Sequence, residues 1–246
     1  MTRKIIEISA GVLSAVEIFY DLSFNERKMI ADKCRGLQFD EGDIITTHDD
    51  TGSDVYFIIS GKVRVAIYTV SGREISFGEQ VAGEMFGDIY ALDKKSRSPY
   101  VISLDNTTLA AMSAENFLWV LQLYPSVMSR TFMRLSQLVR LLSRRIVEFS
   151  SLDVRDRLHA ELLRLAWKNM NNSNTATISP APRHVELANR ISTHREAISR
   201  EMTELASSGL IRKRKNRLYI NDVVKLENMV RDTTGNYDNN EHPDEI

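Results

Sequence analysis

Cysteine is nearly absent from the sequence, because Cys34 is the only one among 246 residues. A single thiol cannot form an intramolecular disulfide or supply the four ligands of an iron–sulfur cluster, and it is typical of a protein of the reducing cytosol. Long apolar runs are also missing. The longest uncharged apolar stretch, Asn116–Ser129, contains Gln122 and Pro125 and is shorter than the ~20 residues that cross a bilayer. We therefore expect no membrane span.

An excess of one charge is missing as well, since the chain has 32 basic and 33 acidic residues. The charges are nevertheless unevenly placed. Residues 38–100 contain eleven acids against six bases, whereas residues 183–217 contain nine bases against four acids. A basic C-terminal block predicts a polyanionic partner for that segment alone. A solvated basic face is the alternative that charge alone leaves open.

The N-terminal half predicts a small β domain. Residues 5–34 favour short helices, and residues 37–112 favour short strands separated by glycines about every ten residues. Ser71-Gly72 between two such strands indicates a hairpin turn. The strands are expected at Val55–Ile59, Val63–Tyr68, Glu74–Phe77 and Val101–Leu104. Glycine spacing of this kind favours an antiparallel, jelly-roll-like β-roll.

Residues 113–149 form a helical region that Pro125 divides into a short and a long helix. The long helix carries a strict heptad repeat of apolar residues: Met128, Phe132, Leu135, Val139, Leu142, Ile146 and Phe149. A period of 3.5 residues is typical of helix–helix pairing. It predicts a homodimer through residues 128–149, with packing of the stripe on the chain's own barrel as the alternative.

The C-terminal segment predicts a helix-turn-helix. Asp153 is expected to cap a helix over Val154–Met170, which places a hinge at Phe149–Asp153, and Asn171–Pro182 is expected to be a loop. Two short apolar helix faces follow, on either side of a turn near Ser192 and Thr193. Thr193 is expected to cap the second helix.

The start of that second helix carries side chains suited to base edges. Arg195 and Arg200 can each fork onto guanine O6 and N7, and Glu196 can accept from cytosine N4, at ~1–3 kcal/mol for each good contact. An i,i+4 pair between Glu196 and Arg200 that only solvates the helix is the alternative. Leu210–Lys215 and Arg217–Ile220 then form a basic hairpin, a wing able to rest on phosphates.

The β domain contains a candidate anion site. Gly87 in Gly83–Ile89 lets the backbone approach a ligand closely, and a short helix opening at Ile89 offers free N–H groups to a phosphate. Arg97 and Ser98 would complete the site, and Asp88 would accept from ribose hydroxyls. Each feature is weak by itself, and a surface arginine on a loop is the ordinary alternative.

The chain, apart from about its first 15 residues and its tail, resembles the cyclic-AMP receptor protein/FNR family of bacterial transcription regulators. Residues 55–63, Val-Tyr-Phe-Ile-Ile-Ser-Gly-Lys-Val, resemble the family's paired roll strands. Phe86-Gly87-Asp88 through Arg97-Ser98 resembles its phosphate-binding cassette, and Arg195-Glu196 with Arg200 resembles its DNA-reading motif. The resemblance implies an α+β fold with a cyclic-nucleotide-binding β-roll (1–124), a dimerisation helix and hinge (125–152), a winged helix-turn-helix (153–230) and a disordered tail (231–246).

The resemblance also implies roles for individual residues. Gly87 and Ser98 contact the cyclic phosphate, Arg97 neutralises it, and Asp88 takes the ribose 2′-hydroxyl. The nucleotide site implied in this way comprises Gly87, Asp88, Ile89, Arg97, Ser98, Leu142 and Ser143. The DNA-binding set comprises Thr193, His194, Arg195, Glu196, Ser199, Arg200, Lys213 and Arg214.

Four residues depart from the family pattern. Asp88 replaces a glutamate, Pro99 an alanine and His194 a serine, and Leu142 stands where the first of two adjacent hydroxyl residues meets the purine. Ser143 remains as the single hydroxyl. Since one neutral hydrogen bond contributes only ~0.5–1.5 kcal/mol, we expect both cyclic AMP and cyclic GMP to bind, with a modest preference for cyclic AMP.

The sequence therefore predicts a cytoplasmic, effector-gated, homodimeric regulator that binds double-stranded DNA at a palindromic site and contacts RNA polymerase. Alternatives are the same regulator with another effector or none, and a cyclic-nucleotide-binding subunit that controls an enzyme. No metal or cofactor is expected besides the allosteric nucleotide. An enzyme is not expected, because there is no nucleophile–base pair or P-loop and the five histidines are scattered.

Overall fold

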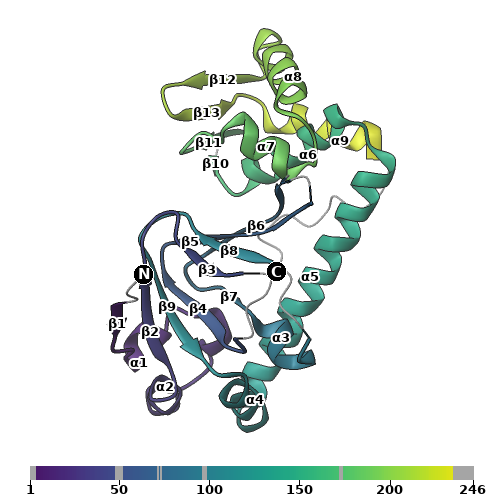
Figure 1. Ribbon diagram of the computed structural model, residues 1–246. Coiled ribbons are helices and arrows are strands. Elements are labelled where there is room, and N and C mark those ends of the chain that lie inside the picture. The colour runs from purple at the N-terminus through teal and green to yellow at the C-terminus, as the bar shows by residue number, and fades with distance from the viewer. Residues whose placement is uncertain are drawn as a thin grey trace. The chain divides into compact units, whose positions relative to one another are not determined.

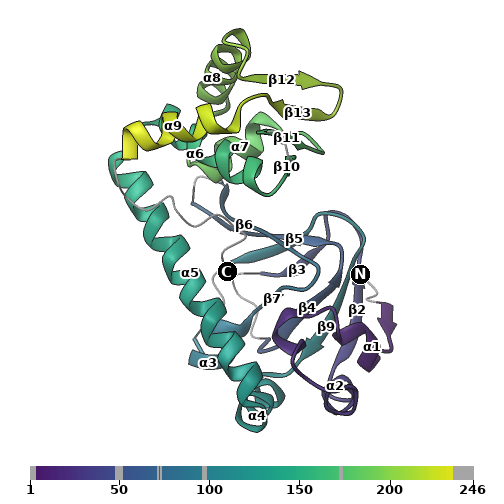
Figure 2. The ribbon, with the colours of Figure 1, turned by 180° about the vertical axis from the view of Figure 1, so that it is seen from behind.

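The computed structural model describes residues 4–47, 52–70, 72, 74–95, 99–171 and 174–234. The chain forms two compact units, Met1–Val139 and Arg140–Ile246. The boundary between them falls inside the long helix α5 (Pro125–Ser151), which Figures 1 and 2 show from opposite sides.

The first unit is built on two antiparallel sheets, of strand order β1-β2-β9-β4-β7 and β3-β8-β5-β6. The strands are β1 (Lys4–Ile6), β2 (Arg35–Phe39), β3 (Ile44–Thr46), β4 (Val55–Ser60), β5 (Lys62–Tyr68), β6 (Glu74–Val81), β7 (Met85–Phe86), β8 (Tyr100–Ser103) and β9 (Thr107–Met112). The helical elements before α5 are α1 (Ala10–Leu13), the 3₁₀ helix η1 (Glu17–Phe19), α2 (Phe24–Ala31), α3 (Asp88–Asp93) and α4 (Ala114–Leu123).

Strand β4 lies at the centre of this unit, because both of its faces are buried. Phe57 belongs to a core shared with the helices, where its ring centroid lies 5.0 Å from that of Phe19. Tyr56 and Ile58, on the opposite face, belong to a second core formed between the sheets. The alternation follows from the two-residue period of a strand. Two buried faces hold the roll together without a disulfide.

The second unit is a helical core with a small sheet, of strand order β10-β11-β13-β12. Its elements are α6 (Val154–Trp167), β10 (Met170–Asn171), β11 (Thr175–Ile178), α7 (His184–Arg190), α8 (Arg195–Ser207), β12 (Ile211–Arg214), β13 (Arg217–Ile220) and α9 (Val223–Thr234). Leu158 of α6 and Leu226 of α9 are fully buried in the shared core, and α9 lies along α6 (Figure 2).

The predicted fold class is confirmed: the chain is α+β, with an N-terminal antiparallel β-roll, a long helix and a C-terminal winged helix-turn-helix. The break at Pro125 is confirmed, since α4 ends at Leu123 and α5 begins at Pro125. The cap at Asp153 is confirmed too, because its side chain accepts from the N–H of Asp156 at 2.9 Å.

Three expectations about local structure were wrong. Residues 171–182 are not only a loop, because β11 (Thr175–Ile178) pairs with β13 inside the sheet. The helix after Asp153 ends at Trp167 and not at Met170. The strand β1 (Lys4–Ile6) precedes the N-terminal helices and pairs with β2. The chain also remains helical to Thr234, and the rest of the expected tail lies outside the described residues.

The turn of the helix-turn-helix contains a residue in a strained conformation, which gives a test of the fold. Ser192 has φ of 54°, in the left-handed region that costs a residue with a Cβ roughly 1–2 kcal/mol. Ser192→Gly should therefore raise the free energy of unfolding by about 0.5–1 kcal/mol, after the greater entropy of glycine in the unfolded chain is subtracted. Thermal denaturation measures it. Thr203→Gly, inside α8, should lower stability, and a loss of stability in both variants would contradict the assigned turn.

Candidate functional site

Helix α8 presents its first two turns to solvent. His194, Arg195, Glu196 and Arg200 are exposed, whereas Ile198, Met202 and Leu205 are buried beneath them. Within the described residues no ion pair joins Glu196 to Arg200. The predicted base-reading side chains therefore share one accessible face, and Glu196 and Arg200 are not engaged in an ion pair with each other.

The start of α8 differs from the expectation. His194 occupies the N-cap position and makes no side-chain cap hydrogen bond, while the backbone N–H of Thr193 donates to the carbonyl of Ala188 at 2.9 Å. The expected cap by Thr193 was therefore wrong. Free N–H groups at the exposed start of a helix can donate to a phosphate.

Ser199, a predicted DNA-binding residue, is already hydrogen-bonded. Its hydroxyl lies 2.8 Å from Nδ1 of His184, the first residue of α7. Burial, with repulsion from Lys213 and Arg195, lowers the pKa of His184. Arg195 of α8 and Lys213 of the wing thus place positive charge near the start of α7.

The wing is the hairpin of β12 and β13, paired in register from Ile211 with Ile220 to Arg214 with Arg217. Lys213 and Arg214 are exposed, and Leu218 is buried against the core. The guanidinium of Arg212 lies 5.2 Å from the ring centre of Tyr219. A hairpin with exposed cations is suited to phosphate contacts.

A buried acid–base pair fixes α8 against α6. Nε2 of His159 lies 2.6 Å from Oε1 of Glu201, and their exposed fractions are 2% and 8%. Arg155 lies on the exposed side of the same carboxylate, 3.5 Å away. Buried polar side chains with satisfied hydrogen bonds specify one arrangement of the elements that carry them, so this pair sets the position of α8.

The first unit contains the candidate nucleotide site around α3. Gly87 is the N-cap of α3 and has φ of 84°, a left-handed conformation that suits glycine. Ile89, in the first turn, is half exposed. Arg97 and Ser98 lie outside the described residues, so the expected contacts of these two with a phosphate stay predictions.

Asp88 is buried and engaged by the chain itself. Asp88 is 2% exposed, and its carboxylate forms an ion pair with Arg134 of α5. Arg134 also donates to the carbonyl of Met85 at 2.8 Å. Burial raises the pKa of Asp88, and Arg134 opposes that rise.

Engagement of Asp88 limits what it can do for a ligand. A carboxylate offers about four acceptor positions, and the guanidinium of Arg134 uses one of them, on Oδ2. The other positions belong to a side chain that is almost fully buried, which restricts the access of a ligand hydroxyl. Arg134 was not identified from the sequence as part of the site. The one sequence signal for Arg134 is its position beside the heptad stripe of α5, on a side of the helix that can face the β-roll.

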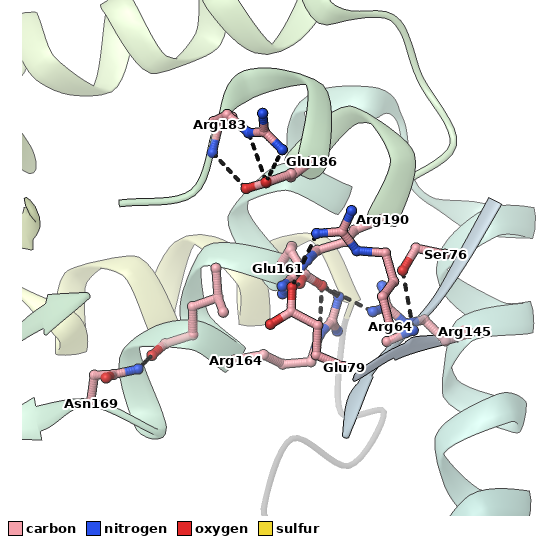
Figure 3. Close-up of polar contacts among 12 residues, drawn as sticks. Arg64, Ser76, Glu79, Arg145, Glu161, Arg164, Asn169, Arg183, Glu186 and Arg190 are labelled. Atoms are coloured by element: carbon pink, nitrogen blue, oxygen red, sulfur yellow. Dashed lines mark hydrogen bonds and ion pairs between the residues drawn. The ribbon is translucent and has the colours of Figure 1, made fainter. Parts of the chain in front are cut away.

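The interior of the second unit contains a cluster of charged side chains, called here the Glu161 cluster: Arg145, Glu148, Glu161, Arg164 and Arg190. Glu161 is 3% exposed, and its carboxylate lies 3.0 Å from Arg145, 2.9 Å from Arg164 and 3.0 Å from Arg190. Figure 3 shows the three guanidinium groups converging on it. Burial alone would raise the pKa of Glu161, but Arg164, Arg145 and Arg190 lower it to about 2.

The Glu161 cluster was not predicted from the sequence. One signal was available: Glu161 follows Leu158 by three residues and precedes Leu165 by four, which places it on the apolar face of α6. A charged residue at such a position indicates a buried ion pair.

The heptad stripe of α5 is largely exposed. The exposed fractions are 60% for Phe132, 63% for Val139, 41% for Leu142, 66% for Ile146 and 40% for Phe149. Met128, at the start of the stripe, packs instead on the core of the first unit. Ser143 is exposed beside Leu142. Within the first unit, Phe132 and Val139 therefore do not pack on the core, in contrast to Met128.

Other chemistries find little support in the described part of the chain. No group of three or more His, Cys, Asp or Glu side chains there could hold a metal ion. No helix in the same residues is long and apolar enough to cross a membrane. Burial raises the pKa of the Cys34 thiol to about 12, so this cysteine is a poor nucleophile.

Comparison with known families matches both units. Residues 37–124 match the cyclic nucleotide-binding domain, and residues 156–229 match the Crp-like helix-turn-helix domain. The chain belongs to the cyclic-AMP receptor protein/FNR family. Members of this family are DNA-binding transcription regulators, and this one contains a cyclic nucleotide-binding domain.

Relatives in the family are similar over most of their length. The cyclic AMP receptor protein of Thermus thermophilus is 26% identical over 215 residues, which are 87% of this chain and 93% of that protein. The CRP-like cAMP-activated global transcriptional regulator of Mycobacterium tuberculosis is 20% identical over 221 residues, 89% and 99% of the two chains. The solved structure of the c-di-GMP responsive global regulator CLP of Xanthomonas campestris has a TM-score of 0.69 and 20% identity, covering 80% of this chain and 99% of its own.

The ion pair at the nucleotide site can be tested by stability. Arg134→Met leaves the carboxylate of Asp88 buried without its cation, which should lower the free energy of unfolding by about 3 kcal/mol at neutral pH. Asp88→Asn combined with Arg134→Met removes both charges and should recover most of that loss. Urea denaturation of the parent, both single variants and the double variant measures the coupling. Additive effects would show that the two groups do not interact.

Proposed function

We propose that this regulator is a cytoplasmic homodimer that binds a palindromic DNA site under the control of a cyclic nucleotide, with cyclic AMP as the preferred effector. The observation that carries the proposal is the exposed face of α8. Arg195, Glu196 and Arg200 project from its first two turns, without a mutual ion pair in the described residues. This is the part of a recognition helix that enters the major groove.

The dimer is supported by the stripe on α5. Large apolar side chains in a heptad repeat are exposed along one face, where a second copy of the same helix would bury them. Two-fold pairing would present two copies of α8 to two half-sites about one helical turn apart. Resemblance to the family suggests a TGTGA-like half-site, and contact with RNA polymerase belongs to the same expectation.

The nucleotide is supported by the match of residues 37–124 to the cyclic nucleotide-binding domain and by the left-handed turn at Gly87. Arg97 and Ser98 are proposed to hold the cyclic phosphate. Asp88 is proposed to accept a ribose hydroxyl at an acceptor position that Arg134 leaves free. Ser143 is proposed to meet the purine beside Leu142, which cannot hydrogen-bond. No cofactor is proposed besides this allosteric ligand.

A second candidate keeps the DNA module and replaces the nucleotide with another effector, or with none. Two observations support testing this second candidate as well. Arg134 occupies the carboxylate of Asp88 in the structure, and the similar regulator of Xanthomonas campestris is described as responsive to c-di-GMP. Binding measurements should therefore include cyclic di-GMP beside the two mononucleotides.

The dimer can be tested at the most exposed residue of the stripe. Ile146→Glu would bring two like charges into an apolar helix pair, where burial of an unpaired carboxylate is costly. We expect the parent to sediment as a dimer and the variant as a monomer at micromolar concentration. Ser136→Glu, on an exposed part of α5 outside the stripe, is the matched control and should remain dimeric. A parent that sediments as a monomer would refute the dimer.

DNA recognition can be tested by selection from random duplexes. We expect a palindrome with G·C pairs in each half-site, and Arg195→Ala should weaken binding to it by ~1–3 kcal/mol per half-site. Lys213→Ala, which removes a phosphate contact, should instead weaken binding to all sequences and reduce its salt dependence. Fluorescence anisotropy at several salt concentrations separates the two effects. Selection that returns no palindrome would contradict the proposal.

Effector binding can be tested by calorimetry with cyclic AMP, cyclic GMP and cyclic di-GMP. Arg97→Ala should weaken cyclic AMP binding by ~2–5 kcal/mol, because a sequestered phosphate loses its cation. Lys95→Ala, two residues away, should change it little. Ser143→Ala should reduce the modest preference for cyclic AMP over cyclic GMP. Unchanged binding in Arg97→Ala would place the site elsewhere, and binding of cyclic di-GMP alone would favour the second candidate.

A further inference from the structure

The Glu161 cluster connects three helices of the second unit through one carboxylate. Glu161 lies on α6, Arg145 on the last turns of α5, and Arg190 at the end of α7, which is the first helix of the helix-turn-helix. The two oxygens divide these partners, since Oε2 accepts from Arg145 and Oε1 from Arg190. Figure 3 shows both arginines reaching the carboxylate. A displacement of α5 therefore acts directly on a group that also holds α7.

Two ion pairs of the cluster bridge the connection between α5 and α6. Besides the pair of Arg145 with Glu161, Arg164 of α6 donates to both oxygens of Glu148 on α5, at 2.5 and 3.3 Å. Fork-shaped arginine–carboxylate contacts fix relative orientation as well as distance. The joint at Leu152 and Asp153, expected to be a hinge, is thus spanned by side chains on both of its sides.

The last turns of α5 carry two functional faces. Ile146 and Phe149 belong to the exposed stripe, whereas Arg145 and Glu148 are half-buried and face α6. The helical period separates these faces around the axis of α5. A rotation of α5 that repacks the stripe therefore moves Arg145 and Glu148 as well.

From α7 the path to the recognition helix is short. Leu187 and Ala188 of α7 share the apolar core with Ile198 and Met202 of α8. Arg190 ends α7, four residues before His194 at the cap of α8. An element held by Arg190 therefore moves with α8.

We propose that the Glu161 cluster is the coupling element that carries a movement of α5 to the recognition helix, with Arg145 as the positioning residue that links the two. The inference rests on the proposed effector-gated function. The ion pairs of the cluster hold the last turns of α5 together with α6 and α7, so that these segments move as a rigid body. Helix α8 then rotates with α5. Because the pKa of Glu161 is about 2, the carboxylate stays ionised throughout the physiological range of pH.

Arg145 is the contact that a movement of α5 would break first. Its Nη2 donates to Glu161 at 3.0 Å, but its buried Nη1 makes no hydrogen bond to any described residue and lies 3.6 Å from Glu148. Glu161 retains Arg164 and Arg190 without it. Removal of Arg145 therefore leaves the buried carboxylate paired and the winged helix-turn-helix able to fold, which separates coupling from folding.

The test compares Arg145→Gln with Arg145→Lys and with Arg231→Gln in the full-length protein. Arg231, in a surface pair with Glu227 on α9, controls for the loss of one positive charge in the same unit. DNA affinity is measured by fluorescence anisotropy on the selected operator, with and without saturating cyclic AMP. The ratio of the two affinities is the coupling factor.

We expect Arg145→Gln to reduce the coupling factor about fivefold or more, while calorimetry shows an affinity for cyclic AMP in the absence of DNA that changes by less than about twofold, because Arg145 lies outside the proposed pocket. Arg145→Lys keeps the charge but not the planar fork and should give an intermediate factor. Arg231→Gln should match the parent. A coupling factor in Arg145→Gln equal to that of the parent would overturn the proposal.

A second measurement does not depend on the nucleotide. Hydrogen exchange should become faster in Arg145→Gln both in the last turns of α5 and in α7, about 40 residues further along the chain. Faster exchange in α5 alone would overturn the proposal. If cyclic AMP leaves the DNA affinity of the parent unchanged, the proposed gating fails, and the exchange of α7 alone decides whether the cluster links the two helices.

Discussion

The carboxylate of Glu161 joins three helices of the second unit. A buried carboxylate costs several kcal/mol in lost hydration unless cations and hydrogen bonds surround it, and here three guanidinium groups from three helices do so. Those helices can be arranged in few ways that keep all three contacts. The last turns of α5 accordingly belong to the second unit, whose boundary falls at Val139 and Arg140 and not at Leu152.

Asp88 is a buried carboxylate of the first unit, and it too is paired with a cation. Here the pairing affects what the carboxylate can offer a ligand. Asp88 is almost fully buried and its carboxylate is paired with Arg134, so the ribose contact proposed for it would have to use an acceptor position that Arg134 leaves free. A glutamate, one methylene longer, would place its carboxylate elsewhere relative to α3. In the proposed site, the shorter side chain would therefore leave the phosphate contacts of Arg97 and Ser98 as the main source of nucleotide affinity.

Features that depend on a local sequence pattern could be predicted, whereas features that depend on contacts between residues far apart in the sequence could not. The heptad of α5, the cap at Asp153 and the exposed triad on α8 are each decided within a few turns of helix. Strand β11 was missed because its alternation is short, polar residues flank it, and its pairing with β13 is set by residues about 40 positions away. Arg134 pairs with a residue 46 positions distant, and Arg190 with one 29 positions distant. The hydrophobic periodicity of a single helix or strand contains no information about such long-range ion pairs.

Two proposed functions lie close together on α5, and we therefore expect gating to distinguish nucleotides better than binding does. Ser143, proposed to meet the purine, lies two residues from Arg145, within the same turn of helix. One hydrogen bond at Ser143 changes the binding free energy by only ~0.5–1.5 kcal/mol. If the hydrogen bond of Ser143 to the purine forms in only one of two arrangements of α5, its full free energy shifts the equilibrium between those two arrangements. The Glu161 cluster would then pass this difference to α8, while the phosphate contacts, common to cyclic AMP and cyclic GMP, contribute to affinity without distinguishing the two purines.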